Sequence, residues 1–295
     1  MNHTYAYAGI VQTAPYTTSG GALASLTLKA ADPNATATVS YDGSGLPSSL
    51  TIQSVNMSVN PSTVNQNQTP VSLSGQTTPA STTAVQLDDG VTVGTTMQNS
   101  AAILMSYKPS GGSNTTFQYQ TFGPWAYDNG STGGSISWFS YGIPFSATMP
   151  TTGTATYAGI AAGYYFDNSG SIYATTADMS ATADFGASTM SFKTTNTYMV
   201  LAGTSGTGTA NTALDLTTSS TSPLTINGNN FTGTVANAAG TISGNATGLF
   251  YGSSTGLTTG SAGGAAVGTP EEIGGTYAAT GTAGSMLGAF GGKVQ

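Results

Sequence analysis

The stretch TATYAGIAAGYYFDNSGSIYATTADMSATADF (154–185) contains two long runs of alternating, β-branched and aromatic residues. Alternation with a period of two places successive side chains on opposite faces of an extended strand. Between the runs, FDNSGSIY (166–173) offers Asn and Gly, which adopt positive φ at little cost in a hairpin turn. The stretch therefore predicts two antiparallel strands joined by a tight turn.

The same pattern recurs along most of the 295 residues, as in SLTLKA, AILMSYK, SISWFSYGI and YMVLAG, and helical periodicity is almost absent. We therefore predict an all-β protein. Near residue 115 aromatic residues become denser and the spacing between predicted strands becomes shorter, and KPSGGSNTTF (108–117) has the composition of a linker. We predict an N-terminal β domain over residues 1–115 and an eight-stranded antiparallel β-barrel over 116–295. Segment 203–229 is predicted to be a long loop between strands.

Charged residues make up only 5% of the chain, with four scattered lysines, no arginine and a net charge of −7. Binding to nucleic acid is excluded as a function because neutralising phosphates requires clustered cations. The absence of cysteine excludes disulfides and thiolate metal sites. No apolar run reaches the roughly 20 residues of a membrane span. Low charge with abundant Ser, Thr, Asn and Gly is typical of extracellular bacterial β proteins, so we expect export, with any signal or anchor segment absent from this chain.

An ordered set of short motifs runs through the second half of the chain. These are YQTFGPWAYD (119–128), SWFSYGIPFSATMPTTGTATYAGIAAGYY (137–165), ADMSATADFGASTMSF (177–192), FTGTV (231–235), GLFYG (248–252) and EEIGGTY (271–277). In this order they resemble the β-barrel domain of transferrin-binding protein B and its solute-binding relatives, some of which are secreted haem carriers. The resemblance implies that 119–128 opens the barrel and that the first 115 residues form a β-sandwich-like handle domain.

The resemblance also implies a function. We expect an extracellular or surface-displayed bacterial protein that captures a nutrient and delivers it to an outer-membrane receptor or secretion partner. Haem is the leading candidate for the ligand or cofactor, whose identity the sequence leaves unknown. Transferrin itself is not the expected partner, because the chain is smaller than the two-lobed binders and lacks their charged character. The alternative is a structural or adhesive surface protein that self-assembles into β-rich filaments or a coat.

Glu271 and Glu272 are the only glutamates and stand side by side between a proline and two glycines. Adjacent residues on an extended chain point to opposite faces, so the two carboxylates cannot flank one bond as a glycosidase acid/base pair does. In the resembling family this position is the structural entry to the last barrel strand. We therefore interpret the pair as a structural corner.

No catalytic or metal-binding residues are predicted, and we expect a binding protein rather than an enzyme. The single histidine, His3, lacks a nucleophile motif for a triad and partners for a zinc site. It remains a candidate haem ligand together with Tyr5 and Tyr7, since haem iron accepts histidine or tyrosine. The alternative interpretation, which we favour, is a first strand that packs its aromatic residues on the core.

Aromatic residues are densest between residues 117 and 145, where both tryptophans lie. The interior of a small barrel accounts for many of them. The remainder would suit a small apolar ligand or a protein partner, so Trp125, Tyr127, Trp138 and Tyr141 are predicted to form such a surface. Asn-x-Ser/Thr triplets begin at Asn34, Asn56, Asn67, Asn114, Asn230 and Asn245, among others, and the composition alone explains them.

Overall fold

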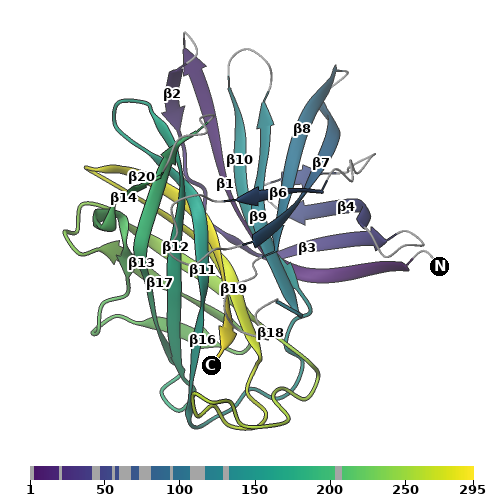
Figure 1. Cartoon of the computed structure of the whole chain (residues 1–295), viewed down its shortest axis with the longest axis vertical. Coiled ribbons are helices and arrows are strands. Elements are labelled where there is room, and N and C mark those ends of the chain that lie inside the picture. Colours follow the sequence, from purple (N-terminus) through teal and green to yellow (C-terminus); the bar gives the residue numbers. More distant parts are fainter. Residues whose placement is uncertain are drawn as a thin grey trace.

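The structure is a computed structural model that describes residues 3–19, 22–41, 47–54, 57–59, 68–72, 81–93, 96–106, 117–128, 133–202 and 208–295. The described residues are mostly β-strand, and the strands form two sheets; the one helical element among these residues is a 3-10 turn at Thr212–Leu214. The predicted all-β class is confirmed. Figure 1 shows the two sheets packed against each other, the first carrying the N-terminus and the second curving into a barrel.

The first sheet contains ten strands, in the order β5-β4-β3-β1-β10-β9-β8-β7-β6, with β2 paired to β1. Its strands are β1 (His3–Ser19), β2 (Ala22–Leu26), β3 (Asp32–Tyr41), β4 (Pro47–Ser54), β5 (Met57–Val59), β6 (Gln68–Ser72), β7 (Ser81–Val93), β8 (Thr96–Ser106), β9 (Gln120–Asp128) and β10 (Gly133–Gly142). β1 pairs with β10 over ten residue pairs. The first and last strands of this sheet in sequence order therefore lie side by side in its middle.

Strands β9 and β10 belong to this first sheet, so the prediction that residues 119–128 open the barrel is wrong. β10 pairs with β1 on one side and β9 on the other. Both of its faces are buried, with Trp138 on one and Phe139 on the other, at 3% and 1% exposure. A strand buried on both faces lies between two packed layers, and here β10 lies between its own sheet's neighbours and the barrel, which Trp138 contacts.

The second sheet closes on itself into an eight-stranded antiparallel barrel, as predicted. Its order is β12-β11-β20-β19-β18-β17-β15-β13-β14, β16 pairs with both β13 and β17, and the β12–β13 pairing completes the ring. The strands are β11 (Thr154–Phe166), β12 (Ile172–Asp184), β13 (Thr189–Leu201), β14 (Thr209–Ala210), β15 (Leu216–Thr217), β16 (Leu224–Asn227), β17 (Asn230–Asn237), β18 (Ser243–Tyr251), β19 (Glu272–Gly281) and β20 (Gly284–Val294).

Closure of the barrel depends on the segment predicted to be a long loop. Its described part holds β14, the 3-10 turn, β15 and β16. The two short strands β15 and β16 together occupy the position between β13 and β17. Strands of two and four residues carry too little alternation to be recognised in a sequence. The prediction of a loop was therefore wrong in the part that the structure describes.

Aromatic side chains fill the interior of the barrel. Phe231 and Phe290 are fully buried, with their ring centroids 6.2 Å apart, and Phe250 lies 5.4 Å from Phe231. Inward-facing glycines make room for large neighbours, since a Cβ at Gly288 would contact the Tyr277 ring. The interior therefore packs as a core, as expected for a barrel of this size.

The first sheet covers one outer face of the barrel. Trp138 and Phe122 from this sheet pack with Ile160, Leu287 and Ala289 of the barrel. A second apolar cluster joins Ile10 of β1 to Leu249 and Tyr251 of β18. No helix among the described residues is long and apolar enough to cross a membrane.

Candidate functional site

The proposed haem ligands lie on β1. His3 and Tyr5 pair with Tyr41 and Val39 of β3, and their side chains lie outside the described part of the structure. Tyr7 is half-buried, and its ring centroid lies 5.7 Å from that of Tyr141. The fold thus places Tyr7 in an aromatic contact within the first sheet, as the core-packing interpretation expects.

The hairpin of β9 and β10 does not present its described aromatic residues to solvent. Trp138 is 3% exposed and meets Tyr164 of the barrel edge to face, with ring centroids 5.6 Å apart. Tyr141 is 6% exposed and stacks on Phe139 at the same separation. The prediction that Trp138 and Tyr141 lie on an exposed binding surface is therefore wrong, because β10 is a central strand whose faces are both covered. The side chains of Trp125 and Tyr127 lie outside the described residues.

Glu271 and Glu272 form the predicted structural corner, and their side chains bind different segments. The Glu271 carboxylate accepts hydrogen bonds from the Ser253 hydroxyl at 2.6 Å and the Ser253 amide at 3.1 Å. The Glu272 carboxylate accepts from the backbone amides of Gln118 and Tyr119 at 2.7 and 3.1 Å. Glu272 thereby ties the first residue of β19 to the segment that leads into β9. Because β20 follows β19, the pair leads into the last strand but one, and the prediction that it leads into the last barrel strand is wrong.

Burial dominates the ionisation of Glu272. Its side chain is 0% exposed, and desolvation raises its pKa from the ordinary 4.5 to about 7. The amide donors and the positive charge of Lys293 oppose this rise but do not cancel it. Further contacts complete the junction, since the Gln120 amide donates to the Ile273 carbonyl at 3.1 Å. The arrangement joins two sheets and contains no pair of carboxylates that share one target atom.

The described residues offer no metal centre, because their His, Cys, Asp and Glu side chains form no group of three or more that could hold an ion. The packed interior of the barrel also leaves an external surface as the place where a ligand would bind.

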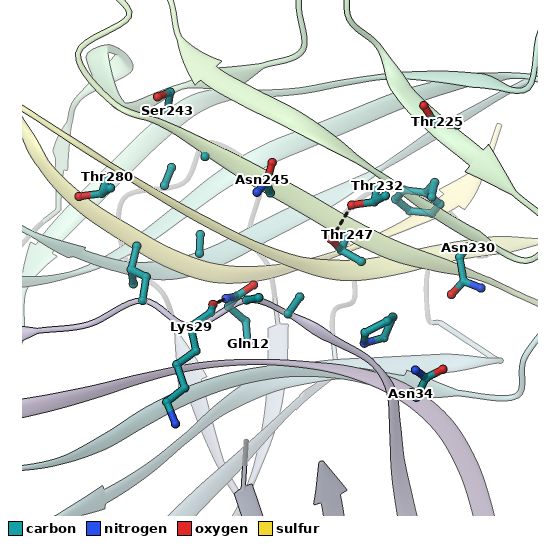
Figure 2. A pocket seen from close by; sticks show the side chains of 18 of the residues that line it. Gln12, Lys29, Asn34, Thr225, Asn230, Thr232, Ser243, Asn245, Thr247 and Thr280 are labelled. Atoms are coloured by element: carbon teal, nitrogen blue, oxygen red, sulfur yellow. Dashed lines mark hydrogen bonds between the residues drawn. The ribbon is translucent and has the colours of Figure 1, made fainter. Parts of the chain in front are cut away.

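A groove of about 700 Å³ lies between the outer wall of the barrel and the first sheet (Figure 2). One wall comes from β16, β17, β18 and β19, and the other from β1, the start of β3 and the segment between β2 and β3. The lining residues are Gln12, Leu28, Lys29, Ala30, Ala31, Pro33, Asn34, Thr225, Asn227, Asn230, Phe231, Thr232, Ser243, Gly244, Asn245, Thr247, Ala278, Ala279 and Thr280. We call this the junction groove.

Strand alternation gives the barrel wall of the junction groove its chemistry. On β17, Phe231 points into the core while Asn230 and Thr232 face outward. On β18 the outward positions include Asn245 and Thr247. The hydroxyls of Thr232 and Thr247 meet across the two strands at 2.9 Å. The barrel wall thus presents uncharged amides and hydroxyls together with apolar groups such as those of Ala278 and Ala279, and no charged side chain.

The opposite wall is held in place by Gln12. This residue is 3% exposed, and its side-chain amide donates to the carbonyl of Lys29. The bond fixes the backbone of the segment that faces the barrel. Lys29 carries the one charged side chain among the lining residues, and Figure 2 shows it extending away from the barrel wall.

Three asparagines of this groove belong to triplets that are visible in the sequence. Asn34, Asn230 and Asn245 each begin an Asn-x-Thr triplet, a spacing that puts Asn and Thr on one face of a strand. Composition explained each triplet separately. Their convergence depends on how the first sheet packs on the barrel, and no local pattern reports that packing.

Comparison with known proteins identifies a family match for the barrel. Residues 149–294 match the family described as the C-lobe and N-lobe β-barrels of Tf-binding protein B. The match covers strands β11 to β20 and leaves the first sheet outside it. No curated protein matches the chain.

Similar solved structures include the intact transferrin-binding protein B described as Ap-TbpB, with its N and C lobes. It is 13% identical, with 100% of this chain and 77% of that chain covered and a TM-score of 0.45. A double mutant of transferrin-binding protein B from Haemophilus parasuis is 14% identical, with 99% and 76% covered and a TM-score of 0.43. The N-lobe domain of lactoferrin-binding protein B from Moraxella bovis is 14% identical, with 97% and 99% covered and a TM-score of 0.37.

Proposed function

The chain carries, over residues 149–294, a β-barrel of the transferrin-binding protein B family, and from this premise we propose that it is a bacterial surface protein that captures an iron-containing nutrient. In this proposal the protein passes its cargo to an outer-membrane receptor. The family match over the whole barrel is the observation that carries the proposal.

Two features of the structure support a binding role on the outside of the molecule. Aromatic residues such as Phe231 and Phe250 fill the barrel, so the barrel acts as a rigid scaffold. The first sheet is fixed to that scaffold through apolar clusters and the Glu272 corner. A rigid pair of sheets holds a binding surface in place before the ligand arrives, which lowers the entropic cost of binding.

Haem is the cargo proposed first, with His3, Tyr5 and Tyr7 as its ligands. Imidazole and phenol groups both bind haem iron, and these residues alternate along the start of β1. Within the part of the chain that the structure describes, β1 pairs with β10 from Ala8 to Thr17, and residues 3–7 pair with β3. In this proposal a planar ligand approaches residues 3–7 on the side opposite β3.

The test is a titration of the purified chain with haem, read by its visible spectrum. We expect a saturable Soret band at one haem per chain, altered by His3→Ala, Tyr5→Phe or Tyr7→Phe. Unchanged spectra in all three variants would exclude these ligands. In parallel, the chain is tested for binding to immobilised iron-loaded transferrin and lactoferrin. Failure to bind haem and both proteins would overturn iron capture, and ordered polymers in electron micrographs would then favour the structural alternative.

A further inference from the structure

Most asparagines of the barrel outside the junction groove have a protein partner for the side-chain amide; Asn229 is the exception, since its buried Oδ1 has none. Outside the groove, the side-chain amides of Asn168, Asn196, Asn211 and Asn237 each bond to a protein group, such as the Thr282 carbonyl at 2.7 Å for Asn168. Within the described structure, the side-chain amides of Asn227, Asn230 and Asn245 have no protein partner. These three amides line the groove with their donors and acceptors available.

The charge of the groove excludes ionic ligands. A phosphate or carboxylate would require clustered cations, but Lys29 is the one charged lining residue and its side chain leaves the groove. A metal ion would require carboxylate or imidazole ligands, and the lining contains neither Asp, Glu nor His. An uncharged ligand remains.

The lining mixes apolar groups, such as those of Leu28, Pro33 and Ala278, with uncharged polar groups, so the matching ligand is neither wholly apolar nor a peptide strand. Covering an amide with an apolar surface would cost about 1–3 kcal/mol for each unpaired group. A peptide strand would need a free sheet edge, but β18 pairs with β17 on one side and β19 on the other. The wall thus offers side-chain groups and no free backbone edge.

We infer that the junction groove binds an uncharged oligosaccharide. Sugar hydroxyls both donate and accept hydrogen bonds at short spacing, as do the groove's amides and the hydroxyls of Thr232, Thr247 and Thr280. The groove of about 700 Å³ falls within the range of roughly 300–1,000 Å³ common for small-ligand sites. The one lining aromatic residue, Phe231, is 0% exposed, so the site offers no ring for a sugar to stack on.

Binding through hydrogen bonds without stacking is expected to be weak, with Kd of roughly 0.1–1 mM. Because Gln12 and the apolar clusters fix both walls, the site is formed before the ligand arrives. This inference does not rest on iron capture, and a negative haem titration leaves it intact.

The test presents the whole chain to an array of defined neutral oligosaccharides built from hexoses and N-acetylhexosamines, with sialylated and sulfated glycans alongside. A neutral glycan that binds is then measured by calorimetry against Asn230→Ala, Asn245→Ala and the double variant. We expect each single change to weaken binding about tenfold and the double variant to abolish it. Their thermal midpoints should stay unchanged, since these amides hold no protein group.

Asn168→Ala is the matched control, because it removes an exposed asparagine amide outside the groove. It should bind the glycan as the unchanged chain does. The inference is overturned if no neutral glycan binds, if only acidic glycans bind, or if the double variant keeps its affinity.

Discussion

Glu272 is a buried carboxylate that holds two sheets together through amides far away in the sequence. Its partners, Gln118 and Tyr119, lie more than 150 residues earlier in the chain. A buried charge is costly unless hydrogen bonds and opposite charges compensate it. Here the amides and Lys293 compensate in part, and the raised pKa records the remaining cost.

The stability of the protein should depend on the ionisation of Glu272. Its pKa is about 7 in the folded chain, against an ordinary 4.5. Between pH 4.5 and 7, Glu272 is therefore mostly protonated in the folded chain and mostly ionised in the unfolded chain. The stabilisation is fully present below pH 4.5, is lost as pH rises towards and through 7, and amounts to about 3 kcal/mol.

Urea unfolding at pH 5, 6, 7 and 8 measures this effect. The free energy of unfolding should fall with rising pH in the unchanged chain, and Glu272→Gln should flatten the profile because glutamine does not titrate. Parallel profiles for the two proteins would show that Glu272 does not titrate in this range.

A second residue-scale prediction concerns the room that glycine leaves in the barrel. A Cβ at Gly288 would contact the ring of Tyr277, which is 3% exposed. Gly288→Ala should therefore destabilise the protein by about 1–3 kcal/mol through overpacking. The control is Gly186→Ala, where the nearest atom to the new Cβ is an Asp184 oxygen at 3.4 Å. Equal urea midpoints for the two variants would contradict the packing argument.

At the scale of elements, the number of paired residues differs widely between neighbouring strands of the barrel. β11 pairs with β12 over 13 residue pairs and with β20 over ten. By contrast, β15 contributes one registered pair with β13 and two with β17. The closing side of the barrel therefore rests on short pairings, supplemented by side chains such as Thr218, whose hydroxyl accepts from the amide of Phe192 at 3.0 Å.

Hydrogen exchange should reveal this difference. Amides in β11 and β20 are expected to exchange at least about 100-fold more slowly than those in β14 and β15, because local opening of a short strand breaks few contacts. Exchange measured by mass spectrometry or NMR on the whole chain tests the prediction. Uniform protection around the barrel would mean that closure is as strong at β15 as at β11.

At the scale of the whole molecule, the two sheets share their apolar cores. Leu249 and Leu287 face outward from the barrel, yet they are 5% and 0% exposed because the first sheet covers them. The interface also buries a hydrogen bond between the hydroxyls of Ser140 and Tyr251, at 3.1 Å. The family match covers residues 149–294 and so leaves out the sheet that covers this apolar face of the barrel.

Residues 149–294 expressed alone should therefore expose this apolar face. We expect the shortened chain to self-associate, to bind a hydrophobic dye, or to melt more than about 5 °C below the full chain. Size-exclusion chromatography, dye fluorescence and thermal melting measure these properties. A monomeric barrel that binds no dye and has the midpoint of the full chain would show that the first sheet is dispensable for its stability.

The sequence alone determined the β class, the antiparallel barrel and the structural role of the two glutamates. The β class rests on local information, since alternation and turn residues act within a few residues. The barrel and the corner at Glu271 and Glu272 were also supported by the ordered motifs that resemble a known family. The segment 154–185 forms β11 and β12 with the turn between them, as its pattern predicts.

Only the tertiary structure decided which sheet receives β9 and β10, how short strands close the barrel, and where polar residues converge. β10 has the alternation of any strand, and its place depends on the distant partner β1. The junction groove unites Gln12 and Asn34 with Asn230 and Asn245, and the burial of Glu272 depends on residues 118 and 119. These features arise from pairing and packing across long separations, and each local sequence is compatible with more than one such arrangement.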